Sequence, residues 1–154
     1  MGDVSLQQAD LLLKLYDLRR EPVLREARKW IVAAPNFQSM QDIQTHCPPG
    51  TQQNGYLRQV LTYWEMCANM VNRGLIDEEF FWENTGEQWA VWERVKAVVP
   101  EIRQIFKNPM FLANLEKHVV RMEAWREQRA PGSGEAARAY QQAMRDAMAK
   151  AKSA

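Results

Sequence analysis

Carboxylates and aromatic rings are concentrated in residues 77–89, which read DEEFFWENTGEQW. The stretch contains five carboxylates, four aromatic rings and no basic residue. Paired carboxylates can act as general acid and general base, and Glu78, Glu79 and Glu83 are close enough in sequence to do so. The same residues also fit a helix start, because Asp77 is a suitable N-cap and the helix dipole favours carboxylates in the first turn. The stretch therefore indicates either a binding site or an acidic helix corner.

Other sets of catalytic or metal-binding residues are missing from the sequence. The two histidines and two cysteines show neither CxxC nor HxxxH spacing: His46, His118, Cys47 and Cys67. No GxGxxG, P-loop or GxSxG motif occurs. We therefore expect no catalytic, cofactor-binding or metal-binding residue and no cofactor. An enzyme or small-ligand binder that uses the acidic aromatic corner Glu78–Trp92 is the alternative function.

The composition is that of a soluble globular protein of one domain, with 46% hydrophobic and 25% charged residues in 154. No apolar run is long enough to span a membrane and no signal peptide is visible, so we expect a cytosolic protein without a transmembrane segment. The net charge of +1 is unevenly spread. Residues 74–102 carry two basic and seven acidic side chains, whereas residues 103–154 carry ten and five.

The basic C-terminal region gives a third possible function, weak nucleic-acid binding. Trp125 is flanked by Arg121, Arg126 and Arg129, and such rings can stack on bases. The sequence pI of about 7.8 lies below the value of about 9 that is typical of nucleic-acid-binding domains, so this function is disfavoured.

Apolar residues repeat at helical spacing through almost the whole chain. The pattern predicts an all-α fold, an irregular bundle of about six to eight helices with Trp64, Trp89 and Trp92 near its centre. Ser5 is expected to cap a first helix whose turns are marked by Leu6, Ala9, Leu13 and Tyr16, with Leu11, Leu12, Leu15 and Leu18 widening its apolar side. Further helices are expected to start at a capping box of Thr85 and Gln88 and at Asn108-Pro109, and a kink or break is expected at Pro100.

The last part of the chain is expected to be separable. Residues 1–130 are predicted to form the bundle domain, and residues 131–154 a flexible Pro-Gly-Ser-Gly break followed by an Ala-rich amphipathic helix. So much alanine buries little area, and isolated helices of this length are marginal in water. This helix either docks on the body, docks on a partner or frays.

Three consecutive rings, Phe80, Phe81 and Trp82, point about 100° apart on a helix and cannot all face one core. At least one should be exposed or should meet a second element. Together with the amphipathic tail, these extra aromatic rings predict a non-enzymatic protein-interaction module. Its partner is expected to be another protein or a second copy of the chain. The candidate interaction surface consists of Phe80, Phe81, Trp82, Trp125, Arg138, Tyr140, Met144, Arg145 and Met148.

Residues 72–103 carry a family resemblance. The segment Arg73–Asp77 reads RGLID after a central helix, Trp92 follows one helix later, and Pro100–Arg103 makes a Pro-x-x-Arg step. With these motifs the chain resembles a family of small bacterial all-helical domains of unknown function. Many members carry an N-terminal membrane anchor, and we expect none in this chain. The resemblance implies a shared helical fold and assigns no activity or site residue.

Overall fold

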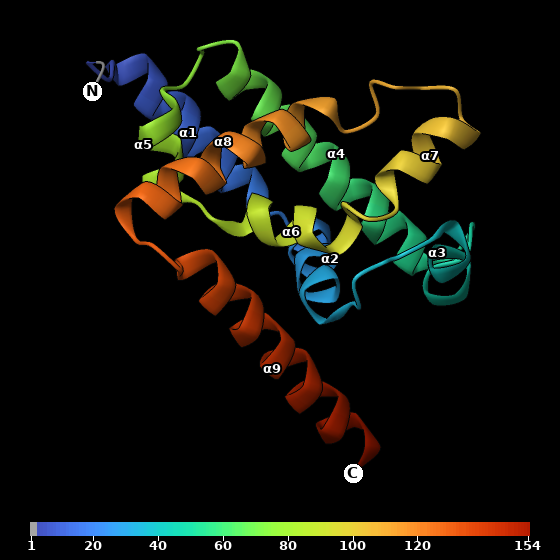
Figure 1. The fold of residues 1–154 in the computed structure, drawn as a ribbon. Coiled ribbons are helices and arrows are strands. Elements are labelled where there is room, and N and C mark those ends of the chain that lie inside the picture. The colour runs from blue at the N-terminus through green and yellow to red at the C-terminus, as the bar shows by residue number, and fades with distance from the viewer. Residues whose placement is uncertain (1–2) are drawn as a thin grey trace.

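Helices are the only regular secondary structure in residues 3–154, the part of the chain that the structure, a computed structural model, describes (Figure 1). There are nine in this range: α1 (Leu6–Arg19), α2 (Pro22–Ala33), α3 (Met40–His46), α4 (Gln52–Asn72), α5 (Glu78–Asn84), α6 (Glu87–Val95), α7 (Val99–Ile105), α8 (Ala113–Arg129) and α9 (Ser133–Ser153). The all-α prediction is confirmed. No described helix is both long and apolar enough to cross a membrane.

The centre of the bundle is α4, which packs against α2 on one side and α8 on the other. Its buried face has the predicted spacing and includes Leu57, Val60, Leu61, Trp64, Cys67, Ala68 and Val71. Trp64, Trp89 and Trp92 are all buried, as expected from the sequence. Figure 1 shows α1 and α5 at one end of the body and α3 and α7 at the other, with α4 running between the two ends.

Several helix boundaries follow from the predicted local chemistry. The Ser5 hydroxyl accepts a hydrogen bond from the Gln8 amide at 3.2 Å, and an Asp77 carboxylate oxygen accepts one from the Phe80 amide at 2.9 Å. Both are N-caps. Gly74 follows α4 at φ +73°, the left-handed conformation that glycine adopts without steric cost.

Two predicted helix starts are wrong. Helix α6 begins after Gly86 without a side-chain cap. The Thr85 hydroxyl instead donates to the Gln88 side chain at 2.5 Å, so it does not accept from a backbone amide as a capping box requires. Asn108-Pro109 starts only a turn, because Leu112 at φ +53° interrupts the chain and α8 begins at Ala113.

The break near Pro100 lies before that proline. Residues 96–98 separate α6 from α7, and Pro100 occupies the first turn of α7, where a missing amide hydrogen has no cost. This break reorients the chain so that α7 leaves the body next to α3 (Figure 1).

The N-terminus of α8 is capped from another helix. Its own N-cap residue, Leu112, offers no side-chain acceptor, and Glu65 of α4 supplies both oxygens instead. One accepts the Asn114 amide at 3.1 Å and the other accepts the Leu115 amide at 2.8 Å. A carboxylate at this position also interacts favourably with the helix dipole.

We expect Glu65→Ala to lower the free energy of unfolding by about 2 kcal/mol, because it leaves two amides of α8 without an acceptor. Urea denaturation of the variant measures this loss. Gln59→Ala on the same helix is the control and should cost less than half as much. Equal losses in the two variants would mean that Glu65 does not cap α8.

Candidate functional site

The carboxylates of the acidic corner are bound by side chains of other helices. Glu78 accepts hydrogen bonds from Arg121 (2.9 Å), Glu79 from Trp125 (3.2 Å) and Arg129 (2.9 Å), and Glu87 from Arg28 (2.6 and 2.7 Å). No group of three or more His, Cys, Asp or Glu side chains within residues 3–154 is arranged to hold a metal ion. Glu78, Glu79 and Glu87 therefore join α5 and α6 to α8 and α2, whereas Glu83 is exposed and forms no ion pair within residues 3–154.

The aromatic residues of the corner lie inside the fold. Phe81 and Trp82 are buried, and Phe80 is half-buried against the core. The Trp82 indole donates to Nε2 of the buried His118 at 3.2 Å, and the half-buried Trp125 packs on Trp82 with ring centroids 5.4 Å apart. The consecutive rings thus meet a second element, α8, which was one of the two expected outcomes.

The first half of α9 is docked by ion pairs on the acidic surface of α6 and α8. Arg138 donates to Glu93 at 3.0 Å and also contacts Glu123. Burial raises the pKa of Glu93, but hydrogen bonds from Arg138 and Lys96 outweigh this effect, and the net result is a lowered pKa. The predicted basic tail and acidic middle therefore pair within one chain.

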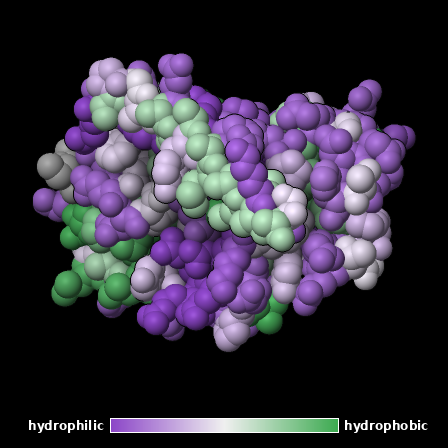
Figure 2. Space-filling model, turned by 90° about the horizontal axis from the view of Figure 1, so that it is seen from below, coloured by the Kyte–Doolittle hydropathy of each residue, from purple (hydrophilic) through white to green (hydrophobic). Residues whose placement is uncertain are grey.

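The other predicted residues of α9 lie farther along the helix. Tyr140 is 66% exposed and Met144 is exposed. Met148 is half-buried, and so is Arg145, whose side chain donates to Gln142 at 2.5 Å. From below, the face of α9 turned to solvent is pale green, the colour of alanine and methionine (Figure 2). This face is only mildly apolar.

A stronger apolar surface lies on α1. Leu6, Ala9, Leu13 and Tyr16 follow one another at intervals of three or four residues and form one stripe along the helix. Leu6 is 86% exposed and Leu13 is 62% exposed. We call these four residues the α1 stripe. The sequence pattern placed Leu6, Leu13 and Leu15 on one broad apolar side of α1, but of these three only Leu15 is buried.

A groove lies at the other end of the molecule, between α3, α4, α7 and the connector 106–112. Its volume is about 740 Å³. Its apolar walls are formed by residues of all four elements, including Ile43, Leu57, Leu61, Ile102, Phe106 and Met110. Phe106 is 66% and Met110 69% exposed, so its rim is also apolar. We call this the α3–α7 groove.

The connector that forms one wall of this groove has an unusual backbone. Lys107 at φ +49° and Leu112 at φ +53° are non-glycine residues in the left-handed region, which costs each of them about 1 kcal/mol or more. The two turns direct Phe106 and Met110 outward and Leu112 inward. Sequence reasoning missed this groove, because no periodic pattern predicts that a leucine adopts the left-handed backbone conformation.

Two charged side chains without an ion-pair partner lie beside each of the two apolar surfaces. The exposed Asp10 and Asp17 follow Ala9 and Tyr16 on α1, whereas Arg58 lines the groove and Lys107 adjoins Phe106 on its rim. None of these four side chains forms an ion pair with another residue in the range 3–154. The unpaired charges named here are therefore negative beside the stripe and positive beside the groove, although Arg19 and Arg20 also lie over the Tyr16 ring and Glu65, which caps α8, also lines the groove.

Comparison with protein families places most of the chain in a described family. A family model described as a domain of unknown function (DUF4760) matches residues 4–122. No curated protein and no solved structure matches the chain. The matched range contains the α1 stripe and the α3–α7 groove and ends within α8, so α9 lies outside it.

Proposed function

The chain belongs to the DUF4760 family of domains of unknown function, and we propose that it is a protein-interaction module that binds a second copy of itself head to tail. The observation that supports this proposal is the presence of two apolar surfaces, the α1 stripe and the α3–α7 groove, at opposite ends of one chain. In the proposed contact, the stripe of one copy occupies the groove of the next.

The shapes of the two surfaces favour this contact. An amphipathic helix that inserts its apolar face into a hydrophobic groove is a recurring mode of recognition, with anchors at i, i+3, i+7 and similar positions. The α1 stripe has this spacing and is convex, and the groove is concave. Leu6 and Leu13 are more than half exposed, so their burial at an interface would remove apolar area from water.

The charges favour the same orientation. Asp10 and Asp17 of one copy would face Arg58 and Lys107 of its neighbour. Complementary charges at the rim of an interface guide association and exclude wrong partners more than they add affinity. If the grooves of two copies faced each other, the basic residues of both copies would be brought together. Groove-to-groove pairing is therefore disfavoured.

A contact between two different surfaces is heterologous, and it can repeat. Such interfaces form closed rings when the rotation between neighbours closes and open filaments when it does not. Because the stripe and the groove lie at opposite ends of the body (Figure 1), each copy can bind two neighbours at once. We therefore expect species larger than a dimer at high concentration.

Sedimentation velocity of the full chain tests this proposal. We expect a dissociation constant between about 1 µM and about 1 mM for self-association. This range corresponds to standard free energies of binding of roughly −8 to −4 kcal/mol. Leu6→Glu and Met110→Glu should each weaken association at least tenfold, because each places a charge in an apolar contact. Both side chains are exposed, so folding should be unaffected.

Two matched controls lie on the same helices but outside the proposed contact. Leu18→Glu lies on α1 away from the stripe, and Ile105→Glu lies on α7 away from the groove lining; both wild-type side chains are about half exposed. Both variants should associate like the wild type. A wild-type chain that stays monomeric over the whole concentration range would exclude head-to-tail association.

The two other functions predicted from the sequence gain no support from the geometry. The carboxylates Glu78, Glu79 and Glu87 of the acidic corner are paired with cations of the same chain. Arg121 and Arg129, which were candidates for phosphate contacts, are the partners of the first two. Both functions stay predictions.

A further inference from the structure

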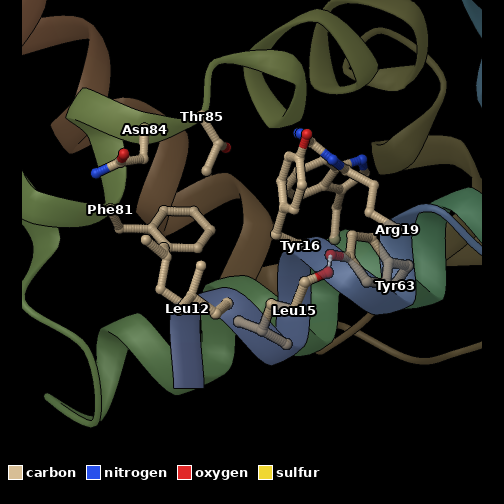
Figure 3. Close-up of a pocket in the computed structure, with 10 residues that line it drawn as sticks. Leu12, Leu15, Tyr16, Arg19, Tyr63, Phe81, Asn84 and Thr85 are labelled. Atoms are coloured by element: carbon tan, nitrogen blue, oxygen red, sulfur yellow. Dashed lines mark hydrogen bonds between the residues drawn. The ribbon is translucent and has the colours of Figure 1, made fainter. Parts of the chain in front are cut away.

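A second cavity, unrelated to the groove, lies where α1 meets α4 and α5. Its volume is about 240 Å³. Figure 3 shows the side chains that surround it, with Leu12, Tyr16 and Arg19 from α1 on one side and Phe81 and Thr85 on the other. The walls are largely apolar and aromatic.

The polar groups at this cavity include two hydrogen-bond donors without an acceptor. Trp64 is 1% exposed and lines the cavity, and its indole N–H is buried without a partner within residues 3–154. The Nε–H of Arg19, which also lines the cavity, is buried and unpartnered in the same sense. A buried donor without an acceptor costs about 1–3 kcal/mol. Two such donors at one cavity indicate a ligand that accepts hydrogen bonds.

The hydroxyl groups at the cavity do not satisfy these donors. The Tyr63 hydroxyl donates to the Leu15 carbonyl at 2.5 Å, which fixes α1 against α4 (Figure 3). The Thr85 hydroxyl donates to the Gln88 side chain. Neither oxygen accepts a hydrogen bond from Arg19 Nε or Trp64 Nε1.

The cavity also carries a positive charge that no carboxylate balances. Arg19 forms no ion pair within residues 3–154, and its guanidinium lies over the Tyr16 ring at 5.0 Å from the centroid. A guanidinium in a fixed orientation binds a carboxylate well, because the planar fork of donors matches the two oxygens. The remaining walls, formed by Leu12, Tyr63 and Phe81, fit an apolar group.

We propose that this cavity binds a small carboxylic acid with an apolar body, whose carboxylate accepts hydrogen bonds from Arg19 and Trp64 and whose body packs against Leu12, Tyr63 and Phe81. The site lies inside the matched family range and is separate from the α3–α7 groove. It does not depend on self-association, although Leu13 and Tyr16 take part in both surfaces.

Three probes of nearly equal size test the proposal by calorimetric titration of the full chain: phenylacetate, 2-phenylethanol and 2-phenylethylammonium. Hexanoate is used as a second carboxylate with an aliphatic body. We expect at least one of the two carboxylates to bind with one-to-one stoichiometry. The alcohol should bind at least tenfold more weakly and the ammonium ion should not bind, because a cation would face Arg19.

Two substitutions test the two donors. Arg19→Met and Trp64→Phe should each weaken carboxylate binding at least tenfold, because each removes one bond to a charged acceptor. Arg20→Met, at the exposed neighbouring arginine, is the matched control and should leave binding unchanged. If Trp64→Phe impairs folding, the indole ¹H–¹⁵N resonance of Trp64 in the wild type gives a second measurement, since it should shift on binding.

Several outcomes would overturn the proposal. It is contradicted if both carboxylates fail to bind at millimolar concentration, or if the alcohol binds as tightly as the matching acid. Arg19→Met must not retain wild-type affinity. The same titration of Leu6→Glu, whose substituted residue does not line the cavity, separates this result from self-association, because the variant should be monomeric and should still bind.

Discussion

Arg94→Met is expected to lower the free energy of unfolding by about 3 kcal/mol. Arg94 is 3% exposed and connects three parts of the bundle. Its guanidinium donates to the Ile31 and Val32 carbonyls at the end of α2 and to the side chains of Asn36 and Gln141. Methionine keeps most of the apolar stem but leaves these four acceptors without their donor.

The charge of Arg94 is retained at some cost. Burial, as the main cause, and the nearby Arg145 together lower its pKa to about 10. The guanidinium is still charged near neutral pH, so its hydrogen bonds to the end of α2 are charge-assisted. It also neutralises the negative end of the α2 dipole, which has no basic residue in its last turn.

Chemical denaturation of Arg94→Met measures the expected loss. Arg25→Met is the control, because Arg25 is an exposed arginine of α2, the helix whose end Arg94 contacts, and forms no ion pair within residues 3–154. The control should change the free energy of unfolding by less than about 0.5 kcal/mol. A loss in Arg94→Met no larger than that of the control would mean that this arginine does not hold α2, α6 and α9 together.

The second large effect is a loss of stability in mild acid, caused by His118. This histidine is fully buried, and its Nε2 accepts the Trp82 indole N–H. The proton of the neutral ring is therefore on Nδ1. Burial and, to a smaller extent, the positive charge of Arg121 together lower the pKa of His118 to about 4. Protonation would also break the bond from Trp82.

The direction of the pH effect follows from the protonation of His118 in the folded and in the unfolded chain. Above pH 6.5 the histidine is neutral in both the folded and the unfolded chain, so its contribution to stability is fully present. Between pH 6.5 and pH 4 only the unfolded chain binds the proton, and the free energy of unfolding falls with decreasing pH. The total loss over this window is about 3 kcal/mol.

Urea denaturation at a series of pH values checks this expectation in two variants. His118→Gln keeps an acceptor for Trp82 but does not titrate, so the decline between pH 6.5 and pH 4 should become shallower by the contribution of His118. His46→Gln removes the exposed histidine and should keep the decline of the wild type. Equal slopes in His118→Gln and the wild type would show that His118 is not the titrating group.

The sequence predicted the fold class because apolar spacing is set by helix geometry. It also predicted the caps Ser5 and Asp77, which depend on residues three positions away. Helix α1 shows where this reasoning fails. It carries leucines on two faces, Leu6 and Leu13 on one and Leu11 and Leu15 on the other, and either face satisfies the helical pattern. Only contacts with α4 decide which face is buried.

The groove and the cavity could not be predicted for a similar reason. Both are bounded by residues far apart in the sequence, such as Ile43 with Met110 and Arg19 with Trp64. The acidic corner attracted attention because its residues are adjacent in sequence, yet its carboxylates pair with arginines of α2 and α8. Local patterns predict helices and caps. A surface site depends instead on side chains from distant parts of the sequence that have no partner in the folded chain.

Mixing two complementary variants tests head-to-tail association most directly. Leu6→Glu has a damaged stripe and an intact groove, and Met110→Glu has the reverse, so each alone should be monomeric. In an equimolar mixture the intact groove of the first can still accept the intact stripe of the second. We expect sedimentation to show a one-to-one heterodimer and no larger species. A mixture that stays monomeric under conditions in which the wild type associates would contradict the pairing of the α1 stripe with the α3–α7 groove.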